Sequence, residues 1–382
     1  MSAPKLTVSR RIRATPYTPK VESLGVSGYS VVNHTILAKG FRKSVEEDYW
    51  HLKEHVQLWD VGCQRQVELK GPDAAKLTQL MTPRDLRQAT AGQCLYAPLV
   101  DGNGLMLNDP IILKLADNHF WLSIADSDIL LWAKGLALGM KLNVKITEPD
   151  VWPLAVQGPK SDDLMAQVFG PSIRDLKFFQ FDYFDFDRHP LLIARSGYSK
   201  QGGFEIYLDK PSIGTELWDA LWQAGKAFNI SPGCPNLIER VEGGLLSYGN
   251  EFTMANNLFE CGFDEYCQLD NDVEFIGKQA LQQIAKRGRE RLIRGVIFDG
   301  GSCPPCQQPW PLTINEEFVG EISTAIWSPR FQRNVALAML EKGFWQAGTQ
   351  VEVSSSDGLI RKGLVTDLPM QDKQIMPLLL AD

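Results

Sequence analysis

The spacing of apolar residues along the chain predicts a mixture of short helices and short strands. Apolar residues at every third or fourth position predict helices over residues 44–58, 73–81, 127–141, 214–228 and 278–287, with another after Gly158-Pro159. Alternating or β-branched runs predict strands over residues 28–36, 66–69, 93–100, 105–115, 120–124, 152–156, 191–196 and 204–208. Residues 233–260 have neither pattern and are predicted to be irregular.

The order of these elements predicts an α+β fold and not a doubly wound one. The turn Asp101-Gly102-Asn103-Gly104 is too short to hold a crossover helix, so the strands on either side of it should pair antiparallel. Beyond residue 291 the chain consists almost entirely of predicted strands and turns. We therefore expect a separate C-terminal β-barrel or sandwich from about residue 290.

Composition narrows the class of ligand. The chain has 382 residues, of which 44% are hydrophobic, and a formal net charge of −7, so it should fold and should not attract nucleic acid or an anionic membrane. The basic N-terminal segment lacks the apolar core of a signal peptide, and no stretch approaches eighteen apolar residues. Seven irregularly spaced cysteines do not indicate a disulfide framework. We expect a cytoplasmic protein with a small-molecule ligand, and whether it forms a homodimer stays open.

Three motifs give weak signals. His51 and His55 are four residues apart but lack a third ligand, so a partly packed helix face is favoured over a metal site, and no metal is predicted. Cys303-Pro-Pro-Cys306 has no second CxxC and does not begin a helix, which favours a turn over a redox site. The glycine-rich loops that bind NAD or ATP phosphates are absent from the sequence, as is the GxSxG elbow.

The segment from Arg195 to Tyr207 carries a stronger signal. Glu205 and Tyr207 are two residues apart on a predicted strand and so share a face, and the predicted hairpin brings Tyr198 opposite them. An aromatic ring with a carboxylate can hold a flat heterocycle that bears N–H groups, although an ordinary hairpin with a tyrosine pair explains the pattern equally well. Asp109 is similarly either a site residue or an edge-strand charge beside Pro110.

Several collinear segments together resemble the folate-binding family of the glycine-cleavage aminomethyltransferase. They are LYAPL from Leu95 with the following DGNG turn and Asn108-Asp109, RSGYSKQGGFEIYL from Arg195, IERVEGGLLSYGNEF from Ile238, DVEFIGKQAL from Asp272, and GEIST with SPRFQRNVALAML near the C-terminus. The resemblance implies a three-domain ring that binds tetrahydrofolate. Two α+β lobes would occupy residues 1–290, with the second lobe, about 60–145, inserted in the first, and a β-barrel or jelly-roll-like domain would occupy 291–382.

The resemblance also implies roles for individual residues. Glu205 matches the glutamate that anchors the pterin, and Asp109 matches the acid near the reacting folate nitrogen. The remaining matches, which lie beside or contact the folate, are Tyr198, Tyr96 and Arg240.

Within the family, residues 10–41 and the loop SKQGGFE look most similar to the dimethylsulfoniopropionate demethylases. These transfer a sulfonium methyl group to tetrahydrofolate, giving 3-(methylthio)propanoate and 5-methyltetrahydrofolate. Gly-Asn-Gly and Asn108-Asp109 stand where aminomethyltransferases have Gly-Gly and Asp-Asp, which disfavours glycine cleavage, while Tyr198 stands where tryptophan is expected in the demethylases. Aromatic faces hold a sulfonium well, and Tyr207, Tyr198 and Tyr29 are candidates.

Two alternatives stay open. In the first, the methyl donor is a methylated amine such as glycine betaine or dimethylglycine. In the second, the chain is a folate-binding factor without transferase activity. The second is less favoured because the Lys-Gly-Cys-Tyr type of signature of such factors is absent from the sequence.

Overall fold

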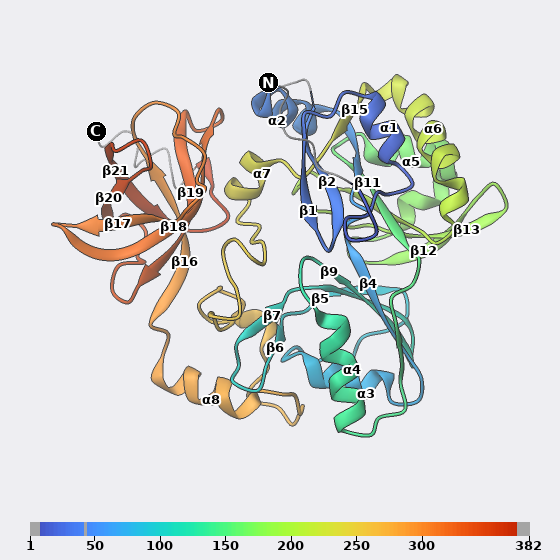
Figure 1. The fold of residues 1–382 in the computed structure, drawn as a ribbon, viewed down its shortest axis with the longest axis horizontal. Coiled ribbons are helices and arrows are strands. Elements are labelled where there is room, and N and C mark those ends of the chain that lie inside the picture. The colour runs from blue at the N-terminus through green and yellow to red at the C-terminus, as the bar shows by residue number, and fades with distance from the viewer. Residues whose placement is uncertain (1–7, 42–43, 373–382) are drawn as a thin grey trace. The chain divides into compact units, whose positions relative to one another are not determined.

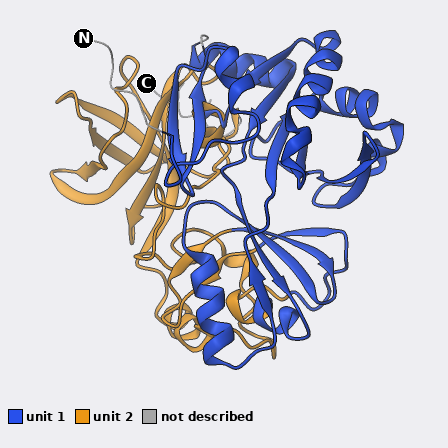
Figure 2. Ribbon diagram, turned by 45° about the vertical axis from the view of Figure 1, so that its right-hand side comes forward, with its two compact units in different colours: residues 1–78, 86–96, 110–236 blue, residues 79–85, 97–109, 237–382 orange. Residues whose placement is uncertain are grey.

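The computed structural model describes residues 8–41 and 44–372. The chain divides into two compact units: unit 1 comprises residues 1–78, 86–96 and 110–236, and unit 2 comprises residues 79–85, 97–109 and 237–382 (Figure 2). Residues 1–7 of the basic N-terminal segment and residues 373–382 of the expected barrel domain lie outside the described residues. The lobe boundaries expected near residues 60, 145 and 290 remain predictions.

A six-stranded sheet in unit 1 has the order β12-β13-β14-β11-β3-β15. Its strands pair antiparallel except β15, which runs parallel to β3. Their bounds are β3 Val56–Asp60, β11 Trp152–Gln157, β12 Phe181–Phe186, β13 His189–Ala194, β14 Gly203–Leu208 and β15 Ile230–Gly233.

Helices cover one face of this sheet. Phe204, Ile206 and Leu208 of β14 point to that face because side chains alternate along a strand. They belong to one hydrophobic cluster with residues of α1 (Thr18–Ser23), α5 (Ser161–Phe169) and α6 (Gly214–Gly225). Glu205 and Tyr207 consequently point to the opposite face.

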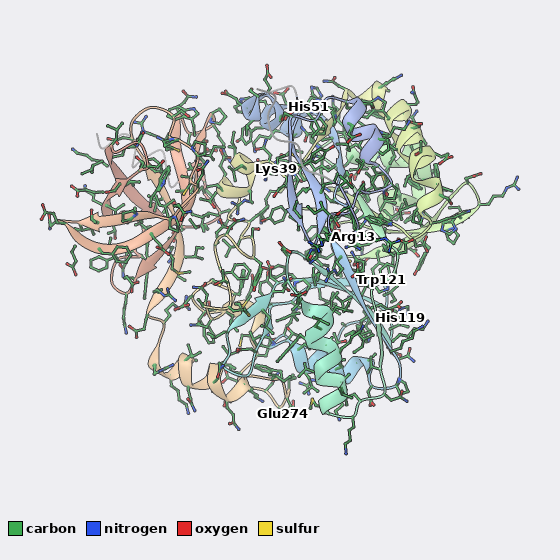
Figure 3. The ribbon with its side chains drawn as sticks, viewed as in Figure 1. Arg13, Lys39, His51, His119, Trp121 and Glu274 are labelled. Carbon is green, nitrogen blue, oxygen red and sulfur yellow. The ribbon has the colours of Figure 1, made fainter. Side chains whose placement is uncertain are left out.

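The opposite face packs on a second, five-stranded sheet of the order β10-β4-β9-β8-β5 (Figure 1). In the shared cluster, Cys94 and Trp121 of the second sheet meet Ala194 and Tyr207 of the first. Figure 3 labels Trp121 together with His119 on β9. The remaining strands and helices of this region are β4 Arg65–Lys70, β5 Gln93–Tyr96, β8 Ile111–Ala116, β9 His119–Ile124, β10 Lys145–Thr147, α2 Val45–Glu54, α3 Ala74–Met81, α4 Ile129–Gly139 and the hairpin β1 Gly28–Val32 and β2 Thr35–Gly40.

Unit 2 contains a closed barrel of the order β16-β19-β18-β17-β20-β21, coloured orange to red in Figure 1. Alternate residues of β16 and β19 fill its interior, among them Val296, Ala336 and Leu340. The elements are β16 Arg291–Phe298, β17 Trp310–Ile314, β18 Glu317–Ser328, β19 Arg333–Glu341, β20 Gln350–Ser354, β21 Ile360–Thr366, the short pair β6 Leu99–Val100 and β7 Met106–Asn108, α7 Leu237–Glu242 and α8 Lys278–Arg287.

The α+β composition, the antiparallel pairing around residues 101–104 and the C-terminal barrel confirm the predictions. The single strand expected over residues 28–36 is wrong, because Asn33 and His34 have positive φ and form a hairpin turn between β1 and β2. The helix expected over 44–58 ends at Glu54. The next residues form β3, all of them buried, and a short buried strand cannot be distinguished from a helix by spacing.

Two longer predicted strands are each divided in two. The strand over residues 93–100 breaks at Ala97-Pro98, and the one over 105–115 breaks at Asp109-Pro110, since proline lacks the N–H that a ladder needs. Helix α7 lies in the stretch predicted to be irregular, and β12 was not predicted. Among the residues that the structure describes, none of the helices is long and apolar enough to cross a membrane.

Candidate functional site

Glu205 is a buried carboxylate near the centre of the six-stranded sheet. Its residue is 6% exposed and lies directly between Ala155 of β11 and Ala194 of β13. Ser196 Oγ donates a hydrogen bond to its carboxylate. Burial raises the pKa of Glu205, and hydrogen bonds from Ser196 and Gln64 partly oppose that rise.

The surroundings of Glu205 fit a ligand that carries N–H groups. Within residues 8–41 and 44–372, no basic side chain forms an ion pair with this carboxylate. A carboxylate offers about four acceptor positions, so acceptor capacity remains after Ser196 and Gln64 have bonded. The two flanking alanines carry only methyl groups and so do not compete for these acceptor positions. These features suit the N–H edge of a pterin.

The loop from Gly197 to Gly203 joins β13 to β14 and carries Tyr198, which is half-buried. Tyr207 pairs with Leu192 and Glu205 pairs with Ala194. The expectation that the hairpin places Tyr198 opposite them is therefore wrong, since Tyr198 lies beyond the last paired residue of β13. A cross-strand tyrosine pair is excluded for the same reason.

Tyr207 is part of the core between the two sheets. It is 1% exposed, and its ring centroid is 6.2 Å from that of Trp121. Burial raises its pKa well above the usual value, with the Glu205 charge adding to the rise. The structure thus gives Tyr207 a packing role, and its contact with a methyl donor stays a prediction.

Tyr96 ends β5 on the second sheet and is half-buried. Cys94, two residues earlier on the same face, belongs to the cluster that contains Tyr207, and the charge of Glu205 helps to raise the pKa of its thiol. The sequence-predicted residues Glu205, Tyr207 and Tyr96 are therefore brought to the same sheet-to-sheet layer of unit 1.

Tyr29 lies on β1, near Asp60, a buried acid that is not among the residues predicted from the sequence. Asp60 ends β3 and accepts hydrogen bonds from Thr15 Oγ1 at 2.5 Å and from the Gly62 amide at 3.1 Å. Burial raises the pKa of Asp60 to about 6 against the lowering effect of these bonds. Burial, Glu22 and Asp60 together raise the pKa of Tyr29 to about 12. An acid inside the buried run VQLWDVG was the signal that could have revealed Asp60.

In unit 2, Arg240 belongs to a buried polar network. Its Nη1 contacts Glu251 Oε2 at 2.6 Å, and its Nη2 donates to Thr324 Oγ1 at 3.1 Å. Glu251 also accepts from the Ser247 amide at 2.8 Å. The network ties α7 to β18, so Arg240 has a structural role in addition to the predicted folate contact, which stays a prediction.

Asp109, also in unit 2, follows β7 directly and is half-buried. Desolvation raises the pKa of the buried Cys261 thiol, and the charges of Glu260 and then Asp109 add to the rise. Asp109 lies in the break between β7 and β8 and not within a paired strand. Its role near the folate nitrogen stays a prediction.

The weaker motifs have protein partners. His51 Nε2 lies 2.8 Å from the Asn229 carbonyl oxygen, and His55 Nδ1 lies 2.9 Å from Lys160 Nζ. In the described part of the chain, no three side chains of His, Cys, Asp or Glu are grouped to hold a metal ion. Cys303 and Cys306 lie in a loop, as expected, and burial raises the pKa of each thiol to about 11.

Comparison with known proteins agrees with this architecture. The chain is 50% identical to a dimethylsulfoniopropionate demethylase of Ruegeria pomeroyi over 351 residues, covering 92% of this chain and 95% of that protein. It is 27% identical to an aminomethyltransferase of Thermoanaerobacter sp. (strain X514) over 318 residues, or 81% of this chain and 85% of that protein.

The fold matches that of the glycine cleavage system aminomethyltransferase T of Bartonella henselae, with a TM-score of 0.83 at 22% identity, over 94% of this chain and 98% of that one. This match confirms the expected fold type. The family model of the GCVT N-terminal domain matches residues 13–271, and that of the glycine cleavage T-protein C-terminal barrel domain matches residues 291–372. The chain therefore belongs to the glycine cleavage T-protein family.

Proposed function

We propose that this chain is a tetrahydrofolate-dependent methyltransferase that demethylates dimethylsulfoniopropionate. One observation carries the proposal: the chain is identical at half of the aligned positions, over nearly its full length, to a dimethylsulfoniopropionate demethylase. Identity to the aminomethyltransferases named above is much lower. The departures at Gly102-Asn103-Gly104 and Asn108 support the same choice.

The reaction requires little of the protein beyond holding the methyl donor and tetrahydrofolate in position. Tetrahydrofolate, when bound, supplies the N5 nucleophile that accepts the methyl group. The methyl carbon–sulfur bond breaks with its electron pair going to sulfur, so 3-(methylthio)propanoate leaves as a neutral thioether with its carboxylate unchanged. Holding two reactants at attack distance contributes about 7 kcal/mol or more in the best intramolecular cases.

In unit 1, Glu205 is proposed to accept hydrogen bonds from the N–H edge of the pterin. Its buried position strengthens such bonds, because a low-dielectric environment screens them less than water does. Tyr198 and Tyr96 are proposed to lie beside the ring. Tyr29, with its half-buried aromatic face, is the proposed contact for the sulfonium.

The carboxylate of the donor needs a cation. Arg13 is bonded to Glu148 at 2.8 Å and Lys20 to Asp219 at 2.7 Å, so both are already paired. Lys39 of β2 forms no ion pair within the described residues and is exposed (Figure 3). We assign Lys39 as the candidate partner of the donor carboxylate.

In unit 2, Asp109 is proposed to take or orient the proton that N5 loses on methylation. The test uses donor labelled with ¹³C in its sulfonium methyl groups. One equivalent of labelled 5-methyltetrahydrofolate should form for each equivalent of 3-(methylthio)propanoate. Thioether formed without labelled folate would contradict methyl transfer. Labelled folate formed instead from methyl-labelled glycine betaine or dimethylglycine would favour the hypothesis of a methylated-amine donor.

A further inference from the structure

Gln157 is a fully buried amide for which the reaction described above has no role. It is the last residue of β11 and pairs with Gly203 of β14, with 0% of its surface exposed. A buried amide is costly unless its polar atoms are bonded, so its bonds indicate what it holds in place.

All three side-chain bonds of Gln157 involve the loop between β13 and β14. Its Nε2 donates to the carbonyl oxygen of Ser196 at 3.2 Å and to that of Phe204 at 3.4 Å. Its Oε1 accepts from Ser199 Oγ at 2.7 Å. One amide group therefore holds the residue before the loop, the residue after it and a residue in its middle.

Two glycines of the loop make room for this amide. Gly197 and Gly203 have φ of +154° and +146°. A Cβ on Gly197 would lie 2.1 Å from the Gln157 amide, and one on Gly203 would lie 2.3 Å from the Val156 carbonyl oxygen and 2.6 Å from Gln157 Nε2. The glycines thus allow the backbone to fold against Gln157, which accounts for part of the glycine-rich pattern of the loop.

The loop connects Gln157 to the two residues expected to contact the pterin. Ser196 accepts a bond from Gln157 through its carbonyl and donates one to Glu205 through its hydroxyl. Tyr198 lies between Ser196 and Ser199, both of which Gln157 holds. A displacement of the amide would therefore move Tyr198 and the serine that orients Glu205.

We propose that Gln157 is a positioning residue for tetrahydrofolate, acting through the loop from Gly197 to Gly203 without touching the ligand. This inference rests on the proposed function, because it takes the folate site to lie at Glu205. It predicts that Gln157 governs folate binding more than donor binding.

The test compares Gln157→Met, which keeps the side-chain length and removes all three bonds, with the parent chain. Ser199→Ala removes one of the three bonds to Gln157, together with the bond that Ser199 Oγ accepts from the Gln201 amide, and it removes little volume, so it serves if Gln157→Met fails to fold. Asn334→Leu is the matched control, since Asn334 is also fully buried and bonds to the loop residues Asp299, Gly301 and Cys303 in the barrel.

Two readouts are taken for each variant. The first is the KM for tetrahydrofolate, the KM for the donor and kcat. The second is the rate of tryptic cleavage after Lys200, an exposed residue in the loop, which reports loop order without catalysis. We expect Gln157→Met to raise the folate KM about tenfold, to change the donor KM less than about twofold, and to accelerate cleavage after Lys200. Ser199→Ala should act in the same direction and more weakly, while Asn334→Leu should change neither readout.

An unchanged folate KM in both loop variants, with or without faster cleavage, would overturn the positioning role. An equal rise in folate KM in Asn334→Leu would overturn it too, because general destabilisation would then explain the effect. Failure of the parent chain to bind tetrahydrofolate would instead overturn the proposed function, and it is detected before any variant is compared.

Discussion

Replacing Glu205 by glutamine should weaken folate binding and stabilise the fold at the same time. Glutamine keeps the shape of the side chain and can still accept the bond from Ser196, but it removes the negative charge. The negative charge strengthens a hydrogen bond from a ligand N–H group, and burial destabilises the same charge in the folded protein.

The two effects have different sizes and signs. A hydrogen bond to a charged group contributes about 1.5–3 kcal/mol, so losing the charge at one such bond should raise the folate Kd by about 10- to 150-fold. Because the folded-state pKa of Glu205 is raised, its contribution to stability is present at acid pH and is lost as the pH rises through that pKa. The glutamine variant has no such loss and should be more stable than the parent chain at pH 8, with a smaller difference near pH 4.

The assay measures tetrahydrofolate binding by calorimetry at pH 8 and thermal unfolding from pH 4 to pH 8. Glu242→Gln is the control, since Glu242 is a buried glutamate of unit 2 that accepts a bond from Ser328 at 2.6 Å. Folate affinity unchanged in Glu205→Gln would refute the pterin-anchoring role. A variant that loses stability at pH 8 relative to the parent would refute the burial argument.

Three further predictions follow from the same geometry. Burial raises the pKa of Asp60 to about 6, so the parent chain loses stability as the pH rises from 4 to 7.5, and the unfolding free energy of Asp60→Asn relative to the parent should rise by about 2–3 kcal/mol over that range. Parallel pH profiles in urea unfolding would contradict this. Glu251→Gln should lower stability by about 3–5 kcal/mol because it breaks the buried ion pair between Arg240 and Glu251, and adding Arg240→Met should recover part of the loss in melting temperature. Asp109→Asn should lower kcat about 10²- to 10⁴-fold with little change in the Kd for folate, and a full rate in stopped-flow would exclude its proton role.

Regular elements with strong local patterns could be predicted from the sequence. The predicted helix over residues 278–287 coincides with α8, and the predicted strand over residues 204–208 differs from β14 by one residue. The break at Asn33-His34 could not be predicted from hydrophobic spacing, because spacing does not show where two adjacent residues adopt positive φ, even though asparagine and histidine are enriched in that conformation. The spacing predicts a helix that includes the first residues of β3, because every residue of β3 is buried and the alternation that marks a strand is absent.

The residues of the candidate site also differ in whether the sequence could reveal them. Glu205 could be proposed because the residues around it resemble a family motif, and its burial agrees with an anchoring role. Gln157 could not, since it belongs to no local motif and derives its significance from residues distant in sequence. For Asp60 there was a local signal, an acid within a buried run, although the pattern does not show which residues bond to it. Gln157 contacts a loop about forty residues later, as the bonds to Ser196 and Ser199 show. Such contacts depend on the pairing of β11 with β14, which the sequence pattern does not specify.

The most direct test of the proposed function is the ratio of kcat/KM for dimethylsulfoniopropionate to that for glycine betaine and for dimethylglycine, each measured with saturating tetrahydrofolate. A sulfonium is the better methyl electrophile, and we predict that only dimethylsulfoniopropionate supports rapid formation of 5-methyltetrahydrofolate. A higher kcat/KM with either amine would contradict the assignment of a sulfonium donor, and no folate methylation with any of the three would contradict methyl transfer from these donors altogether.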